Sequence, residues 1–264
     1  RSSDSKIAAE ANRAYRGLRP SLARFRTTSW LFPFYSSRWR DVFSYGQIKT
    51  DVNLGKLPLR PYISMRFVGD TRHTTGGPRP ELLSENSVIL AGGFATRYWK
   101  GLVAWGEAGW AMSYLGQRRD AGRMIPDYRG GIAYGKGFGE GASPEASGPF
   151  FETTGDAVYL SRFDDDVLVY SQNRIGWTPG AIAALGDLRT QLYWAGNLTV
   201  DARRQAWANF VETGPGVRFR WPWMPRSLLL YVNLLRGAYT VDQGGLRAAN
   251  YSDLRAGFWY AFTY

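Results

Sequence analysis

Hydrophobic and polar residues alternate with a period of two along most of this chain, and the alternation is clearest at its end. Between Asp253 and Tyr264 the apolar positions are Leu254, Ala256, Phe258, Tyr260, Phe262 and Tyr264. Successive side chains of a β-strand point to opposite faces, so this pattern predicts a strand with one apolar face. Aromatic residues repeated along that face are typical of a surface that meets lipid and its headgroup boundary.

The same alternation predicts about eleven strands of roughly 10 to 14 residues, separated by turn residues. Their ranges are 45–54, 59–70, 87–98, 102–115, 127–136, 152–163, 167–177, 191–201, 209–221, 227–238 and 253–264. Bacterial single-chain barrels have an even number of strands, so we expect about twelve, with the remaining strand in 21–40. The predicted fold class is all-β: a transmembrane antiparallel β-barrel of about twelve strands with a short N-terminal helical or irregular segment.

Three stretches lack this alternation. Residues 1–20 are expected to form an N-terminal segment, with a short helix at 7–15, that plugs the lumen or tethers the barrel of 21–264. The stretches 71–86 and 135–149 contain Gly and Pro among polar residues and predict long loops. Short turns at one end of the barrel and long loops at the other would match the periplasmic and extracellular sides of an outer-membrane barrel.

Composition separates this chain from helical membrane proteins. Hydrophobic residues make up 44% of it, the mean hydropathy is −0.33, and no apolar run approaches the ~18 residues of a spanning helix. Aromatic residues reach 16%, which fits girdles at the two membrane interfaces. The chain has no Cys and therefore no cysteine metal site, and its net charge of +11 comes without a basic run dense enough to indicate nucleic acid.

The alternation assigns polar strand positions to a lumen and apolar positions to lipid. The expected lumen-lining residues are Lys49, Asp51, Arg60, Tyr62, Arg66, Glu107, Asp127, Arg129, Asp156, Arg174, Tyr193, Glu212, Arg218, Arg220 and Arg255. The expected lipid-facing residues are Ile48, Ile63, Met65, Phe67, Trp110, Trp194, Leu228 and Leu230.

Two interpretations of the lumen residues stay open. Charges inside a narrow barrel can pair with one another and seal it, because an unpaired buried charge is costly. Alternatively, the surplus of cations in this set, with Tyr62, Tyr193 and Tyr231 as stacking surfaces, guides an anionic or sugar-like solute. A ~12-stranded barrel is intermediate between packed and wide barrels, so its size allows either.

The sequence offers no catalytic arrangement, and we expect no enzyme activity, no metal and no cofactor. His73 is the only histidine, and its neighbours are Arg and Thr rather than the serine nucleophile of a Ser/His esterase. The carboxylates Asp164 and Asp165 fall in an expected turn, where solvation accounts for them. The function expected from these residues is therefore passive.

The C-terminal strand resembles the sorting signal of bacterial outer-membrane barrels, whose pattern is polar, any, Gly, any, any, aromatic, any, aromatic. Arg255, Gly257, Tyr260 and Phe262 fill the defined positions. In that family the signal recruits the barrel-assembly machinery. The resemblance implies this machinery and outer-membrane lipid as partners, in the outer membrane of a Gram-negative bacterium.

Several stretches resemble the C-terminal barrel of outer-membrane proteins that serve exopolysaccharide export and bacteriophage adsorption, in which tetratricopeptide repeats commonly precede the barrel. They are 35–47 (YSSRWRDVFSYGQ), 59–72 (LRPYISMRFVGDTR), 127–134 (DYRGGIAY), 161–170 (SRFDDDVLVY), 210–220 (FVETGPGVRFR) and the closing strand. The resemblance implies a pore or scaffold of an envelope polysaccharide export system, with polysaccharide or other envelope subunits as partners. The alternatives are an uptake porin for acidic oligosaccharides, an autotransporter-type translocator and a structural anchor subunit of an envelope complex.

Overall fold

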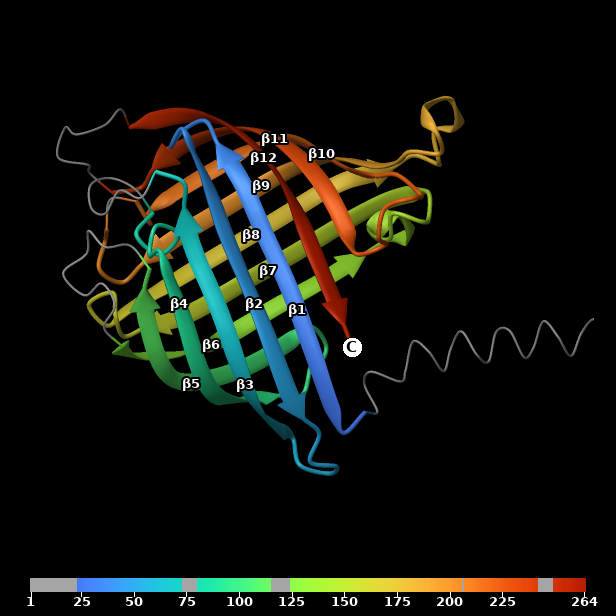
Figure 1. Cartoon of the computed structure of the whole chain (residues 1–264). Coiled ribbons are helices and arrows are strands. Elements are labelled where there is room, and N and C mark those ends of the chain that lie inside the picture. The colour runs from blue at the N-terminus through green and yellow to red at the C-terminus, as the bar shows by residue number, and fades with distance from the viewer. Residues whose placement is uncertain (1–22, 73–79, 115–123, 206, 242–248) are drawn as a thin grey trace, which may run out of the picture.

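Twelve antiparallel strands, each paired with its neighbours in sequence, form a sheet that closes where β1 meets β12 (Figure 1). The computed structural model describes residues 23–72, 80–114, 124–205, 207–241 and 249–264. The strands are β1 (Phe25–Ser36), β2 (Asp41–Val52), β3 (Leu59–Asp70), β4 (Ser87–Thr96), β5 (Leu102–Ser113), β6 (Met124–Phe138), β7 (Gly148–Leu160), β8 (Asp166–Thr178), β9 (Arg189–Asp201), β10 (Phe210–Arg220), β11 (Leu228–Tyr239) and β12 (Asn250–Thr263). The predicted fold class is confirmed, while the N-terminal segment of 1–20 lies outside the described residues.

β1 is the further strand that the sequence predicts within 21–40 without defining its bounds. It closes the barrel against the C-terminal strand. Backbone hydrogen bonds join both ends of this seam, from Thr27 N to Tyr264 O at 2.9 Å and from Ser37 N to Leu254 O at 3.0 Å. The final residues therefore belong to the barrel wall. Within the described residues the helices are two single 3-10 turns, η1 (Glu140–Ala142) and η2 (Ala183–Leu185), and none there is long and apolar enough to cross a bilayer.

The two rims of the barrel differ less than the sequence predicts. We call the rim where β1 begins and β12 ends the proximal rim, and the opposite one the distal rim. The distal connections are 37–40, 71–86, 114–123, 161–165, 202–209 and 240–249, and the proximal ones are 53–58, 97–101, 139–147, 179–188 and 221–227. The expectation of short turns at one rim only is wrong, and the two expected long loops lie at opposite rims.

The second of these loops is also shorter than predicted. Residues 135–138 continue β6, because Gly135 pairs with Thr154 and Phe138 pairs with Phe151 on β7. Glycine is disfavoured in strands but not excluded from them, so a Gly-rich sequence alone does not define a loop.

The outer wall of the barrel is apolar over most of its area. Among the predicted lipid-facing residues, Ile48, Ile63, Met65, Trp110 and Trp194 are exposed on it. Phe67, Leu228 and Leu230 are half-buried by their neighbours on the same wall.

One row of polar and small residues interrupts this wall. Cross-strand register aligns its members from β6 to β12 as Lys136, Thr153, Asn173, Gly196, Thr213, Arg236 and Ser252. Neighbouring side chains satisfy part of the row, since Asn173 Nδ2 donates to Ser171 Oγ at 3.2 Å and Trp194 Nε1 donates to Thr213 Oγ1 at 2.7 Å. Strict alternation of apolar and polar faces therefore fails in the middle of β8.

Candidate functional site, the lumen and its distal mouth

The residues predicted to line the lumen all occupy inward positions of their strands, alternating with the residues of the outer wall. The half-buried ones are Lys49, Arg174, Arg218 and Arg255, and Asp156 is exposed within the lumen. The buried ones are Asp51, Arg60, Tyr62, Arg66, Glu107, Asp127, Arg129, Tyr193, Glu212 and Arg220.

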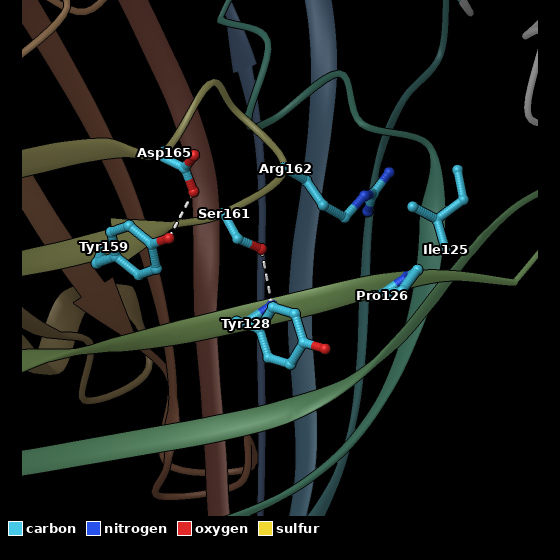
Figure 2. A pocket seen from close by; sticks show the side chains of 7 residues that line it. All are labelled: Ile125, Pro126, Tyr128, Tyr159, Ser161, Arg162 and Asp165. Atoms are coloured by element: carbon cyan, nitrogen blue, oxygen red, sulfur yellow. Dashed lines mark hydrogen bonds between the residues drawn. The ribbon is translucent and has the colours of Figure 1, made fainter.

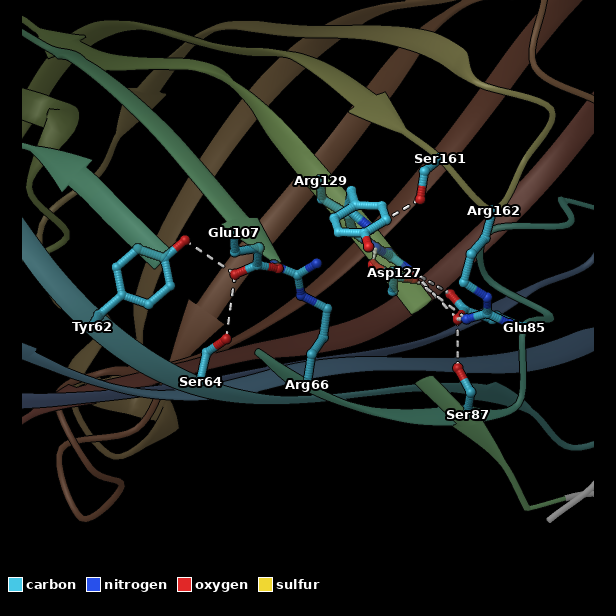
Figure 3. Close-up of polar contacts among 11 residues, drawn as sticks. Tyr62, Ser64, Arg66, Glu85, Ser87, Glu107, Asp127, Arg129, Ser161 and Arg162 are labelled. Carbon is cyan, nitrogen blue, oxygen red and sulfur yellow. Dashed lines mark hydrogen bonds and ion pairs between the residues drawn. The ribbon is translucent and has the colours of Figure 1, made fainter. Parts of the chain in front are cut away.

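Glu107 on β5 gathers three side chains of β3 (Figure 3). Its carboxylate accepts hydrogen bonds from Tyr62 Oη at 3.0 Å and Ser64 Oγ at 3.3 Å, and lies 2.7 Å from Arg66 Nη2. The intervening strand β4 contributes Gly93, where a Cβ would lie 2.8 Å from Glu107 Cβ. A small residue on β4 therefore allows side chains of β3 and β5 to meet.

Asp51 on β2 is held from both sides. Arg26 Nη2 of β1 lies 2.6 Å from one carboxylate oxygen, and Arg60 Nη1 of β3 lies 2.8 Å from the other. The group ties three neighbouring strands together towards the proximal rim.

Two further ion-pair groups occupy the other side of the lumen. Glu152 on β7 lies 3.4 Å from Arg174 on β8 and 2.7 Å from Arg218 on β10, joining strands that are not neighbours. On β12, Arg255 pairs with Asp253 of the same strand and with Glu212 of β10, each at 2.8 Å.

Several anions that complete these groups were missing from the sequence prediction. Glu152, Asp253 and Glu85 each pair with arginine, so the surplus of cations in the predicted set is not a surplus of unpaired cations in the lumen. The alternation could have found Asp253, because it lies two positions before Arg255 on the same strand face. Glu85 could not be found in this way, since it lies in the connection between β3 and β4, where residues do not alternate between two faces.

Glu85 is the centre of a polar cluster at the distal mouth (Figure 3). Its side chain is fully buried, and its carboxylate lies 3.0 Å from Arg129 Nη2, accepts a 2.5 Å hydrogen bond from Ser87 Oγ and pairs with Arg162. Arg129 on β6 also binds Asp127, with Nε 2.6 Å from Oδ1. Removing one member of a buried charge group typically costs about 3–5 kcal/mol, because a partner is left uncompensated.

Apolar side chains from the same connection cover the rest of this mouth. Leu82 and Leu83 pack against a cluster that includes Trp39, Phe43 and Trp207. Trp207 comes from the connection after β9, and Trp39 from the turn after β1, so three distal connections converge over inward residues of the wall. The segment 80–86 is therefore folded into the mouth, with Glu85 bound on one side and the two leucines packed on the other.

The segment enters β4 through a fixed bend. Asn86 is buried in the left-handed conformation, with φ of 52°, which Asn tolerates better than most residues. Its Oδ1 accepts from Asp70 N at 3.0 Å and its Nδ2 donates to Ser84 O at 2.9 Å. These bonds fix where the segment leaves the mouth.

The turn after β1 is held by aromatic rings. The Arg38 guanidinium carbon lies 3.7 Å from the ring centroid of Tyr251, 4.2 Å from Trp39, and 4.6 Å from both Phe210 and Tyr239. Cation–π contacts are strongest where the cation loses water, as it does between four rings. The arrangement fixes the turn beside the seam of the barrel.

Two predicted lumen residues do not join an ion pair within the described part of the chain. Lys49 lies with its ammonium 5.0 Å from the ring centroid of Tyr62. Asp156 lies opposite Tyr170 on the neighbouring strand. They are the predicted charges that the structure leaves outside the pairing groups.

The residues that the sequence raises for possible chemistry are His73, Asp164 and Asp165. The described residues contain no group of three or more His, Cys, Asp or Glu side chains placed to hold a metal ion, and His73 lies outside them. Asp164 and Asp165 lie in the predicted turn with φ of 56° and 54°.

Comparison with known proteins gives distant structural similarity only. No protein-family model matches the chain, and no curated protein matches it. The beta domain of the Bordetella autotransporter BrkA is 15% identical, with 89% of this chain and 98% of that one covered and a TM-score of 0.36. LpxR from Salmonella typhimurium (6%, 88% and 99%, TM-score 0.35) and an outer membrane channel from Pseudomonas putida F1 (13%, 90% and 94%, TM-score 0.36) are similarly distant. Values this low assign neither a family nor a function.

The barrel itself defines the class of protein. A closed antiparallel sheet, apolar outside and polar inside, is the β-structure that can satisfy its backbone hydrogen bonds within lipid. The chain is an outer-membrane β-barrel, and its location is the outer membrane of a Gram-negative bacterium.

Proposed function

We propose that this protein is a pore or scaffold of an envelope polysaccharide export system, that it rests with its distal mouth closed, and that it carries out no chemistry. The observation that supports a closed state is the segment 80–86, which Glu85 anchors to Arg129 and Arg162 inside the mouth. The polysaccharide system is supported by the sequence resemblance of the barrel strands. The distal rim carries the longest connection, 71–86, and is the side we assign to the cell exterior.

The pairing of the lumen charges weighs against an uptake porin for acidic oligosaccharides. Such a solute would have to displace carboxylates that already bind Arg66, Arg218 and Arg255. The same pairing favours a structural anchor subunit as the second candidate, because a sealed barrel needs no open state. No contact among the described residues favours an autotransporter-type translocator.

Planar-bilayer recording separates the pore from the anchor. We expect the native protein to show no channel openings, and Glu85→Gln to open because it removes one of the two carboxylates, Glu85 and Asp127, that contact both Arg129 and Arg162. Asp164→Asn is the matched control, since it removes a carboxylate from the same rim at an exposed turn position. Openings at least tenfold more frequent in Glu85→Gln than in both others support the pore. If Glu85→Gln opens no more often than the native protein, the pore is contradicted and the structural anchor remains as the candidate function. A native protein that is steadily open contradicts the closed state.

The polysaccharide assignment has its own test. In a strain that secretes the polymer, loss of this protein is expected to trap it in the periplasm, and the native gene should restore secretion. Normal secretion without the protein would contradict the assignment, whatever the bilayer recordings show.

A further inference from the structure

A second concave feature lies on the distal rim, between the start of β6 and the turn after β7 (Figure 2). It is a pocket of ≈ 500 Å³ lined by Ile125, Pro126, Tyr128, Tyr159, Ser161, Arg162 and Asp165. Tyr128 and Tyr159 belong to the outer wall and are 53% and 38% exposed. The pocket therefore opens outward, and its lining residue Arg162 also belongs to the charge cluster of the distal mouth.

The local structure fixes its polar groups and leaves aromatic surface uncovered. Register places Gly130 opposite Tyr159, so no side chain from that position covers the ring. Tyr159 Oη donates to Asp165 Oδ1 at 2.5 Å, and Ser161 Oγ accepts from Tyr128 N at 2.9 Å. Two tyrosine rings, a hydroxyl and a carboxylate are thus held at defined positions around one cavity.

The charge of the pocket disfavours an anion. Arg162 is its cation, and this guanidinium already pairs with buried Glu85 and lies 3.4 Å from Asp127. Asp165 adds a further negative charge to the lining of the cavity. A phosphate or carboxylate would meet more negative than positive charge here.

We propose that this pocket binds a sugar ring that carries no negative charge, either neutral or amino-substituted. One face of a sugar is formed by C–H groups that can lie on a tyrosine ring, and its hydroxyls can donate to Asp165 and accept from Arg162. The site could take this sugar from a soluble or exported polysaccharide, or from a glycolipid headgroup in the adjacent outer leaflet. The pocket shares Arg162 with the closed mouth, but its two tyrosines lie outside that charge cluster, so sugar binding can hold or fail independently of the closed pore.

Calorimetric titration of the full-length protein in detergent micelles tests it. The probes are maltohexaose as the neutral sugar, a chitosan hexamer as the amino sugar and hexagalacturonate as the anionic one. We expect at least one of the first two to bind in the micromolar to millimolar range and hexagalacturonate not to bind. Repeating the titration in nanodiscs that contain lipooligosaccharide distinguishes the sources, because loss of probe binding there identifies the membrane sugar as the occupant.

Variants then assign the binding to the pocket. Tyr128→Ala with Tyr159→Ala should weaken binding at least tenfold, whereas Tyr128→Phe, which keeps the ring, should retain it. Trp177→Ala is the matched control, because Trp177 is an exposed aromatic residue on β8 at the other rim. Heat-modifiable migration in gels verifies that each variant is folded. Unchanged binding in the double variant, binding of hexagalacturonate alone, or no binding of any probe by the native protein overturns the proposal.

Discussion

Gly257 on β12 is where a single methyl group should test the closure of the barrel. It pairs with Phe34 across the β1–β12 seam, and a Cβ at this position would lie 2.3 Å from Pro33 O and 2.8 Å from Phe34 Cβ. Ordinary carbon contacts are about 3.5–4.0 Å, so Gly257→Ala must push two backbones apart by roughly 1 Å. Overpacking of this kind costs about 1–3 kcal/mol, and the cost falls on the strand pair that closes the ring.

Urea unfolding of the refolded barrel in detergent, followed by Trp fluorescence, measures this cost. Gly106→Ala is the control, since nothing lies within 4 Å of a Cβ at that position on β5. We expect Gly257→Ala to lower the unfolding free energy by about 1–3 kcal/mol relative to Gly106→Ala. Equal stability of the two variants would refute the steric reasoning, and any remaining assembly defect in cells would then belong to recognition of the C-terminal strand.

Three further predictions concern the lumen, the wall and the chain end. Glu107→Gln should destabilise the barrel by about 3 kcal/mol because it removes the anion of buried Arg66, and adding Arg66→Met should recover much of the loss in a double-mutant cycle of unfolding free energies. Asn173→Leu should stabilise the protein in lipid vesicles by about 1–3 kcal/mol, since it removes an amide from a wall that faces hydrocarbon, and a loss of stability would indicate that the hydrogen bond from Asn173 to Ser171 outweighs the cost of burying that amide. Deletion of 258–264 should prevent membrane assembly, which fractionation and gel migration would show, whereas a folded truncated barrel would contradict the sorting function of this strand.

Period-two alternation was enough to predict the class of fold and most strand positions. The prediction works because each strand of a membrane barrel has lipid on one side and the lumen on the other, so apolar and polar residues alternate along it. It failed for β1, where Trp30, Phe32 and Phe34 point inward and the inner face is aromatic rather than polar. Because both faces of that segment hold apolar residues, polar and apolar positions do not alternate along it.

The closure of the distal mouth could not be predicted from the same signal. Leu82, Leu83 and Glu85 lie in a connection, where no period relates a residue to a face. Their positions depend on contacts with Trp207 and Arg129, which are far away in sequence. The structure shows that this connection packs against the wall, because the Glu85 carboxylate is buried and the half-buried Leu82 and Leu83 contact the aromatic cluster.

The arrangement of the ion pairs indicates how such a barrel could change state without losing its wall. Asp51 with Arg60, and Glu107 with Arg66, join strands that are adjacent or next but one, so these contacts stiffen the wall and need not break when the mouth opens. Glu85 differs, because its pairs join a connection to the wall and hold that connection in the mouth. Movement of 80–86 would expose Arg129 and Arg162 to water rather than leave them buried and unpaired, which lowers the cost of opening well below that of breaking a pair inside the wall.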